Sequence, residues 1–387
     1  MRILLFSDSL YPEFVGGIER RNADLSAALA RRGHAVTLAG FGRSVPAPGV
    51  RVISLGERRP LYAASGSRRA WPAIELARAA GRLPIGEYDV VETSNVPFAH
   101  LFPLAARCAA ARKPLLVSWY EYWGKYWNAY AGLRGPIFRT VEWISAQVGS
   151  VVASSALTAG RLGRRRLRRG IPVVPCGTDI DEIVAATAGI AEEPGRIIYA
   201  GRLLAHKRVH LLLEAVAGLP RARLVVYGDG PARPALVELA RRLRIEDRVE
   251  LRAPSPDRAE LWREIRRSAV AAQPSAREGF GIFPLEAMAA GVPVVYLRSR
   301  DSAVEEVVRP GIEGVRAEPD ARSLGEALGR LLDDAGARAE MGARGRERAR
   351  EYRADRSAAE IEGLLEALRD RRSVRNGGKA GRPDSAV

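Results

Sequence analysis

The chain has 387 residues, 47% of them hydrophobic, with 61 Lys and Arg against 45 Asp and Glu. This length accommodates two domains of roughly 150 to 200 residues, each with its own core. The two cysteines, Cys108 and Cys176, argue against a disulfide framework or a thiolate metal site and indicate a reducing compartment. The first residues lack the apolar run of a signal peptide, and no run approaches the roughly 18 apolar residues of a membrane span, so we expect a cytoplasmic protein.

The net charge of +16 is concentrated in the first half of the chain. Residues 1–175 contain 25 Lys and Arg against 11 Asp and Glu, whereas the rest contains 36 against 34. Such a positive electrostatic field favours an anionic partner. This partner would be a phosphorylated acceptor or the inner face of the cell membrane, with which the protein would associate peripherally. Nucleic acid is not expected, because the sequence has no recognised nucleic-acid module. The alternative is compositional bias, since 57 of the basic residues are Arg.

The first part of the chain alternates short apolar runs with amphipathic helical patterns. The runs that predict buried strands span residues 2–7, 35–41, 50–55, 89–94, 114–119, 150–155 and 171–176. Strands that alternate with helices are typical of a parallel sheet with crossover helices. Residues 1–176 are therefore predicted to form a first Rossmann-like domain.

A polar segment punctuated by Gly and Pro, residues 177–195, links this domain to a second series of the same kind. The strands predicted there span residues 196–201, 223–228, 248–253, 269–274 and 292–297. We expect a second Rossmann-like domain over 196–351, a last helix over 352–372 that packs back toward the first domain, and a disordered tail over 373–387. The fold class is thus α/β, with two doubly wound domains facing a central cleft.

Ligands of open parallel sheets bind beyond the carboxyl ends of the strands, so the loops that follow the strands are the candidates for chemistry. After the first strand, Gly16 and Gly17 precede a predicted helix, where uncovered backbone N–H groups can meet a phosphate. A tight turn explains this pair equally well. At the start of the second domain, Arg202 and Lys207 would neutralise a diphosphate and stabilise it as it leaves. A solvated cation at a helix start is the alternative for Lys207, but the helix dipole disfavours it.

The segment EGFGIFPLE places Glu278 in a loop and Glu286 beyond Pro284, a residue that suits the first turn of a helix. We therefore expect Glu286 in that first turn and both carboxylates at the cleft. Glu286 would accept two hydrogen bonds from a vicinal diol such as a ribose, while Glu278 would bind hydroxyls of a second sugar. Gly279 and Gly281 leave backbone N–H groups uncovered between them. A helix cap at Glu286 and an exposed Glu278 are the alternatives.

The sequence resembles the retaining glycosyltransferases of family 4, the "group 1" enzymes of the GT-B fold, over nearly the whole chain. The resemblance rests on GGIER (16–20), CGTDID (176–181), AGRLLAHKR (200–208), VVYGDGP (225–231) and EGFGIFPLEAMAAGVPVV (278–295), the last of which matches the E-x7-E motif of that family. It implies transfer of a sugar from a nucleotide diphosphate sugar, such as a UDP- or GDP-sugar, to a hydroxyl of a glycan, glycolipid or natural-product acceptor. It also implies that no metal and no cofactor are needed beyond this co-substrate.

The same resemblance assigns roles to residues. Arg202 and Lys207 would hold the donor diphosphate, Glu286 would hold the ribose, and Gly16 and Gly17 would reach the phosphate from the acceptor-binding first domain. Glu278 would face the donor sugar and phosphates together with the backbone of Phe280, Gly281 and Ile282. Backbone near Gly228, Gly230 and Pro231, and near residues 252–254, would recognise the base. The catalytic residues implied are Arg202, Lys207 and Glu278.

One position departs from the family. Many relatives have a His after the fifth strand of the first domain, commonly followed by Asp, whereas this chain has Tyr120 and Glu121 there. A Tyr hydroxyl can hydrogen-bond a sugar hydroxyl but brings no positive charge at neutral pH. His100 is a candidate substitute, although a lone His at a helix start is more often structural.

An aromatic segment follows this position. The rings of Trp119, Trp123, Tyr126, Trp127 and Tyr130 have helical spacing, which usually marks a core. Five rings in so short a stretch also suit a sugar-stacking or membrane-interface platform. We place Tyr120, Glu121, Trp123 and Trp127 on the acceptor side. The Arg-rich stretch 161–170 either attracts anionic lipid or a phosphorylated acceptor, or forms a solvated helix surface.

Two other functions fit parts of this pattern. A non-hydrolysing sugar-nucleotide epimerase also has the GT-B fold, but it needs acid/base side chains across the cleft and no acceptor pocket. The third function is a catalytically inert protein that binds a sugar nucleotide or a membrane. The only feature that supports it is Tyr120 in the place of the usual His.

Overall fold

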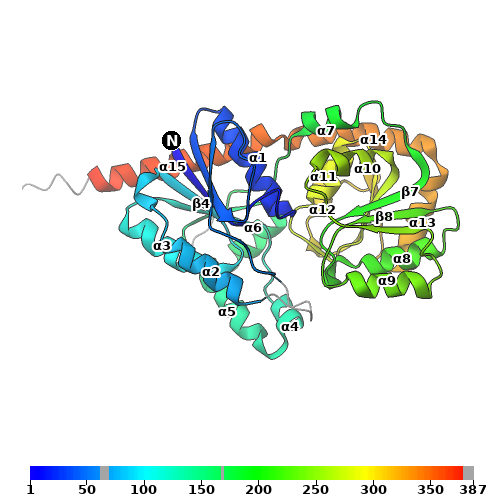
Figure 1. Ribbon diagram of the computed structural model, residues 1–387, viewed down its shortest axis with the longest axis horizontal. Helices are drawn as coiled ribbons and strands as arrows, with labels where there is room; N and C mark the ends of the chain where they lie inside the picture. The colour runs from blue at the N-terminus through cyan, green and yellow to red at the C-terminus, as the bar shows by residue number, and fades with distance from the viewer. Residues whose placement is uncertain (62–68, 167–169, 378–387) are drawn as a thin grey trace, which may run out of the picture.

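The computed structural model describes residues 1–61, 69–166 and 170–377, with side chains up to residue 371. Two α/β domains lie next to each other along the long axis of the molecule (Figure 1). The first domain occupies the blue-to-cyan half of the view and the second the green-to-orange half.

The first domain is built on a parallel sheet of six strands in the order β3-β2-β1-β4-β5-β6. The strands are β1 (Arg2–Ser9), β2 (Ala35–Phe41), β3 (Val50–Ser54), β4 (Val90–Ser94), β5 (Leu115–Trp119) and β6 (Ser150–Ala153). The helices are α1 (Gly17–Arg31), α2 (Trp71–Ala80), η1 (Ile85–Glu87), η2 (Phe98–His100), α3 (Leu101–Ala110), α4 (Tyr126–Ala131), η3 (Gly132–Arg134), α5 (Gly135–Ser145) and α6 (Ala156–Gly163). Strands β4 and β5 are buried along their whole length, as expected for a sheet covered on both faces.

The second domain repeats this strand order, as β14-β12-β10-β7-β8-β9. Its strands are β7 (Glu193–Ala200), β8 (Arg223–Tyr227), β9 (Val249–Arg252), β10 (Ser268–Gln273), β12 (Val294–Leu297) and β14 (Gly314–Ala317), and β11 (Arg277–Glu278) pairs separately with β13 (Asp301–Ser302). The helices are α7 (Ile180–Thr187), η4 (Ala205–Lys207), α8 (Val209–Ala217), α9 (Arg233–Arg242), α10 (Arg258–Arg267), α11 (Ile282–Ala289), α12 (Val304–Val307), α13 (Ala321–Asp333), α14 (Ala335–Ala349), η5 (Arg350–Tyr352) and α15 (Ala354–Gly377).

The predicted fold class is confirmed by these two doubly wound parallel sheets. One predicted strand is wrong: residues 171–176 contribute only an isolated bridge between Ala153 and Val173. Pro172 and Pro175 lack the backbone N–H groups that a central strand would need. The sequence also gave no signal for β14, which is four residues long, and the linker 177–195 contains α7 and the start of β7.

Helix α15 returns from the second domain and packs on the first, along the upper edge of the first domain in Figure 1. Its residues Ala358, Ile361 and Leu365 are buried in the same core cluster as Leu25 and Leu29 of α1. The helix continues past residue 372, and residues 378–387 of the predicted tail lie outside the described residues.

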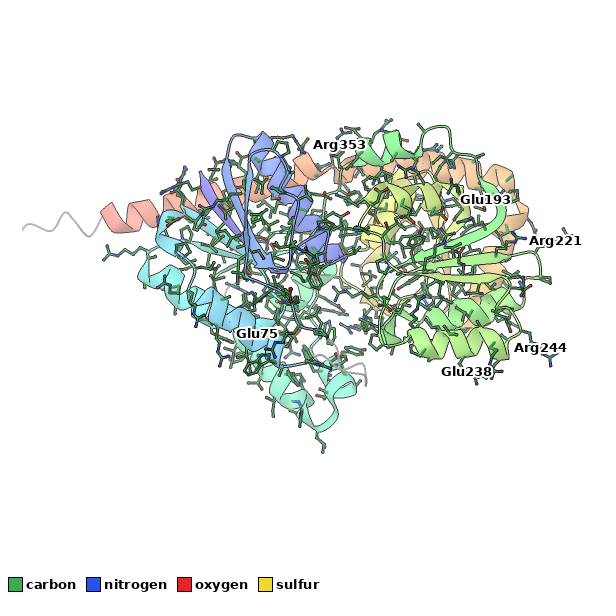
Figure 2. The ribbon with its side chains drawn as sticks, in the orientation of Figure 1. Glu75, Glu193, Arg221, Glu238, Arg244 and Arg353 are labelled. Carbon is green, nitrogen blue, oxygen red and sulfur yellow. The ribbon has the colours of Figure 1, made fainter. Side chains whose placement is uncertain are left out.

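Polar contacts fix the two domains against each other. Arg258 Nη2 donates to Asp24 Oδ2 at 2.9 Å, and Glu306 accepts from the backbone N–H groups of Ala156 and Leu157 at 2.7 and 2.8 Å. This places a carboxylate at the N-terminus of α6, where the helix dipole favours it. Other charged residues lie far from this interface. One of them is Arg221, labelled at the outer edge of the second domain in Figure 2.

Candidate active site

The two domains enclose a cavity of about 1340 Å³. Its lining includes residues that directly follow strands of both sheets, among them Asn95 after β4, Tyr120 after β5, Gly201 after β7 and Gly228 after β8. The cavity therefore lies beyond the carboxyl ends of the strands, the place where doubly wound sheets bind ligands.

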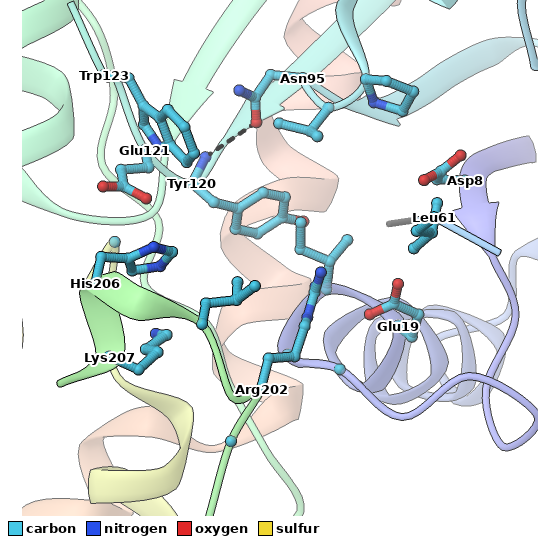
Figure 3. Close-up of a pocket in the computed structure, with 18 of the residues that line it drawn as sticks. Asp8, Glu19, Leu61, Asn95, Tyr120, Glu121, Trp123, Arg202, His206 and Lys207 are labelled. Atoms are coloured by element: carbon cyan, nitrogen blue, oxygen red, sulfur yellow. Dashed lines mark hydrogen bonds between the residues drawn. The ribbon is translucent and has the colours of Figure 1, made fainter. Parts of the chain in front are cut away.

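Residues predicted to contact the donor phosphate come together from both domains. Gly16 caps α1 in an extended conformation, and a β-carbon added there would lie 3.2 Å from Arg202 Nη2. A β-carbon on Gly17 would lie 3.2 Å from Ile282 Cδ1. Arg202 rises into the cavity next to the start of α1 in Figure 3. Because glycine leaves the backbone uncovered, the start of α1 can approach a ligand held by Arg202.

Lys207 and Glu278 form an ion pair at the same site. Lys207 Nζ lies 2.6 Å from Glu278 Oε2, which also accepts a hydrogen bond from Gln273 Nε2 at 2.6 Å. Lys207 is the last residue of η4 rather than the first of α8, so a short turn aims it into the cavity. Both side chains are mostly buried, which fixes the ammonium group before any ligand arrives.

The structure places Glu286 in the second turn of α11, so its predicted place in the first turn is wrong. Gly281 adopts φ 113°, a conformation open to glycine, and this lets the helix begin at Ile282. The Glu286 carboxylate is 1% exposed and accepts hydrogen bonds from Arg20 Nη1 at 2.9 and 3.2 Å and from Trp262 Nε1 at 3.0 Å. It is thus a fixed acceptor at the cavity wall.

Arg20 and Trp262 are functional candidates that the sequence analysis missed. Arg20 is the last residue of the GGIER motif and lies one helical turn after Gly17, on the same face of α1. That spacing was the available signal. It could not reveal that the partner of Arg20 lies in the other domain.

Phe280, Gly281 and Ile282, predicted to face the donor sugar and phosphates, line the cavity. Of the segments predicted to recognise the base, Gly228 and Pro254 line the cavity, whereas Gly230 and Pro231 do not. A β-carbon on Gly230 would lie 2.5 Å from the carbonyl oxygen of Leu203, so this glycine permits close packing of two loops. Arg252 forms salt bridges with Glu250 and Glu264 instead of lining the cavity.

The four residues predicted for the acceptor side, Tyr120, Glu121, Trp123 and Trp127, all line the cavity. Burial raises the pKa of the Tyr120 phenol, which therefore stays neutral. Burial also raises the pKa of Glu121, although Arg277 Nε donates to its Oε1 at 2.7 Å. Figure 3 shows Glu121, Trp123 and His206 on one side of the cavity and Arg202 and Glu19 on the other.

The aromatic segment does not form one helix, contrary to its spacing. Trp119 is the last residue of β5 and is fully buried in the core of the first domain. Trp123 precedes α4, and Tyr126, Trp127 and Tyr130 lie on it. Trp123 and Trp127 have ring centroids 4.6 Å apart. The segment therefore contributes both to the core and to the cavity wall.

A histidine does line the acceptor side of the cavity, but it belongs to the second domain. His206 lines the cavity, and its ring centroid lies 6.2 Å from that of Trp123. Burial, with the charges of Lys207 and Arg277, lowers the pKa of His206 to about 3. The ring is thus neutral at physiological pH. His100, the candidate considered from the sequence, is 1% exposed, contacts the backbone oxygen of Ser94 at 3.0 Å and does not line the cavity.

Part of the Arg-rich stretch 161–170 is structural. Arg161 pairs with Asp301 across the domain interface, and Arg166 donates to the carbonyl oxygens of Ala146 and Gly149 at 2.7 and 2.9 Å. Residues 167–169 lie outside the described residues. Within the described chain, no group of three or more His, Cys, Asp or Glu is placed to hold a metal ion. None of the described helices combines the length and apolar character needed to cross a membrane.

Two family models match this chain in tandem. "Glycosyltransferase Family 4" matches residues 15–182, and "Glycosyl transferases group 1" matches residues 181–348. A D-inositol 3-phosphate glycosyltransferase from Xylanimonas cellulosilytica is 32% identical over 402 residues, which cover 93% of this chain and 94% of the relative.

Solved structures share the architecture. A sucrose-phosphate synthase from Thermosynechococcus elongatus superimposes with a TM-score of 0.80 at 21% identity, covering 95% of this chain and 99% of the other. An Anabaena protein crystallised with UDP-glucose gives a TM-score of 0.72 at 20% identity, covering 95% and 100%. The expected family resemblance and GT-B fold are thereby confirmed.

Proposed function

We propose a retaining sugar transfer for this chain, which belongs to the group 1 and family 4 glycosyltransferases. The donor is a nucleotide diphosphate sugar, and the acceptor is a hydroxyl group of a second molecule in the same cavity. UDP-glucose in the Anabaena structure supports a donor of this class. The reaction forms a bond between the acceptor oxygen and the anomeric carbon and breaks the bond from that carbon to the diphosphate.

The observation that carries this proposal is that Arg202, Lys207, Gly16 and Gly17 line one cavity, with the Gly16 backbone close to the Arg202 guanidinium. A leaving diphosphate gains negative charge as its bond to the sugar breaks. Donors and cations already fixed around that point stabilise the developing charge without reorganising, which is a large source of rate enhancement. Lys207 is fixed by Glu278 at 2.6 Å.

We infer that the acceptor attacks on the face from which the diphosphate leaves. In this reaction the leaving phosphate oxygen accepts the proton of the acceptor hydroxyl, so no protein base is required. Neutral Tyr120 and neutral His206 fit this scheme, because both can orient hydroxyl groups without carrying charge. Metal-free charge neutralisation by Arg202 and Lys207 is part of the same proposal.

Glu286 and Arg20 are proposed to receive the nucleotide ribose together. The buried carboxylate accepts from Arg20 and Trp262, which leaves its orientation fixed while a ribose diol approaches. The pair joins α1 of the first domain to α11 of the second. Donor binding at Glu286 would therefore be sensitive to the position of the first domain.

The proposal is tested by incubating the protein with UDP-, GDP- and ADP-sugars and measuring free nucleotide diphosphate with and without an acceptor. Release that depends on the acceptor is the expected result. A changed sugar nucleotide without release would instead identify an epimerase. Binding of a donor with neither outcome, across the acceptors tried, would identify an inert sugar-nucleotide-binding protein.

A further inference from the structure

We propose that the acceptor is an amphiphile, with a neutral hydroxylated head bound beside Tyr120 and an apolar chain bound in a groove of the first domain. This inference rests on the proposed sugar transfer, because it assigns the second substrate of the same cavity. Two sets of side chains carry it: unpartnered polar atoms at the head site, and exposed apolar residues along one arm of the cavity.

The head site is defined by Glu19, Asn95 and Tyr120. All three line the cavity, and among the described residues Glu19 Oε2, Asn95 Nδ2 and Tyr120 Oη have no hydrogen-bond partner although each atom is buried. Residues Asn95 and Glu19 are 0% and 8% exposed. Buried polar groups are nearly always satisfied, so unpartnered atoms on three residues that line one cavity point to a ligand that supplies the partners. Together they offer one acceptor, one amide donor and one hydroxyl.

The charge of this site selects a neutral head. Glu19 accepts a hydrogen bond from Ser9 at 3.0 Å. Of the two cations on this side of the cavity, Arg58 is paired with Asp8, and Arg202 is assigned to the donor diphosphate. A phosphorylated head would meet the Glu19 carboxylate and find Arg58 engaged, which costs electrostatic energy. Hydroxyl groups of a sugar or another polyol can donate to Glu19 and accept from Asn95 or Tyr120.

The apolar arm continues from the head site between α2 and α5, both of which contact η2. Its rim carries large apolar side chains that are unusually exposed, namely Ile74, Phe102, Leu133, Ile137 and Phe138, at 40%, 40%, 101%, 64% and 39%. Phe98 and Trp127 form part of its floor. Helices α2 and α5 lie on the lower side of the first domain in Figure 1. Apolar exposure concentrated along one arm of a cavity marks a binding site.

The occupant of the apolar arm follows from the connection of this arm to the cavity where sugar transfer is proposed. The apolar arm and the head site belong to one cavity, so a single molecule can fill both. A flexible hydrocarbon chain fits such an arm, whereas a second folded copy of this protein could cover the rim but could not place a hydroxyl beside Tyr120. We therefore assign the arm to the alkyl, acyl or prenyl chain of the acceptor.

The test measures binding of methyl, hexyl and octyl β-glucosides to the full chain by calorimetry, without donor and below the micelle-forming concentration. Each methylene that enters the arm should tighten binding about fourfold, so octyl glucoside should bind more than 100-fold more tightly than methyl glucoside. Ile137→Ser should weaken the octyl compound at least fivefold and leave the methyl compound unchanged. Tyr120→Phe, which removes only the hydroxyl, should weaken both compounds alike.

Val237→Ser is the matched control, because Val237 is a similarly exposed β-branched residue at 52%, on α9 of the second domain and outside the cavity lining. It should change neither affinity. Equal affinities across the glucoside series would overturn the apolar assignment. So would a dimer, detected by sedimentation, that Ile137→Ser dissociates, because a second copy would then cover the rim.

The two proposals fail separately. Chain-length-dependent binding without nucleotide diphosphate release from any donor would keep the amphiphile assignment and remove the transferase mechanism. Acceptor-dependent release with methyl and octyl glucosides at equal kcat/KM would keep the transferase and remove the amphiphile.

Discussion

Replacing Gly279 by Ala perturbs a close approach between the backbones of the two domains. Gly279 follows Glu278, and its carbonyl oxygen accepts from Ser154 Oγ of the first domain at 3.4 Å. A β-carbon at Gly279 would stand 2.0 Å from the carbonyl oxygen of Tyr120 and 2.8 Å from its carbonyl carbon. Non-bonded carbon atoms in contact lie about 3.5 to 4.0 Å apart, so the loop and Tyr120 would have to separate by roughly 1 Å.

This separation cannot be absorbed by a flexible side chain. The opposing atoms belong to the backbone of Tyr120, whose carbonyl also accepts from Ser154 Oγ and Thr158 Oγ1 at 3.3 and 3.2 Å. Gly279 is not among the described glycines with positive φ, so Ala suits its local backbone and each domain should still fold. The variant therefore moves Glu278 relative to the acceptor side without removing a functional side chain.

A misplacement of about 1 Å in an active site costs on the order of 100-fold in rate. We expect Gly279→Ala to lower kcat/KM for nucleotide diphosphate release by about that factor, with a Tm close to that of the wild type. Gly363→Ala is the control: this exposed residue of α15 has open space at its β-carbon, and its kinetics should not change. Wild-type kcat/KM in Gly279→Ala would refute the inference that the position of Glu278 relative to the acceptor side sets the rate.

Three further changes test individual side chains. Lys207→Met removes a fixed cation and should reduce kcat by about 100- to 1000-fold while circular dichroism stays unchanged; near-normal turnover would remove Lys207 from the diphosphate site. Glu286→Gln should weaken binding of the nucleotide diphosphate about 10- to 100-fold in calorimetry, because hydrogen bonds to a charged group are worth about 1.5 to 3 kcal/mol, and an unchanged Kd would contradict the ribose assignment. His206 binds a proton near pH 6.5 when unfolded but only near pH 3 when folded, so stability should fall as the pH drops through that window. His206→Gln should lose less stability there in urea titrations, and an identical loss would show that the folded imidazole is not held neutral.

Much of the fold follows from local sequence. Apolar runs at β1, β2, β7 and β8 alternate with helical patterns, and parallel pairing then follows because crossover helices join the strands. The strand ends in turn bring Arg202 and Glu278 to one edge. Two segments could not be assigned in this way. Strand β14 has only four residues, too few to show a hydrophobic pattern. Residues 171–176 have an apolar pattern, but their two prolines lack the backbone N–H groups that a strand needs.

The missed site features depend on contacts between distant parts of the chain. Arg20 meets Glu286 at a separation of 266 residues, and only the approach of the two domains creates that pair. His206 lines the acceptor wall for the same reason, since Trp123 belongs to the other domain. The position of Glu286 in its helix depends on the φ of Gly281, which lets the helix begin at Ile282, whereas Pro284 in the sequence indicated a later start.

The central claim is transfer with retention from a nucleotide diphosphate sugar, and the anomeric configuration of the product tests it most directly. The wild-type protein would be incubated with an α-linked UDP-sugar and octyl glucoside, with GDP- and ADP-sugars as further donors, and the anomeric proton of the product followed by NMR from the first turnovers. An α-linked product, formed together with nucleotide diphosphate and lost in Lys207→Met, is the predicted result. A β-linked product, or an epimerised sugar nucleotide with no new glycosidic bond, would contradict the account.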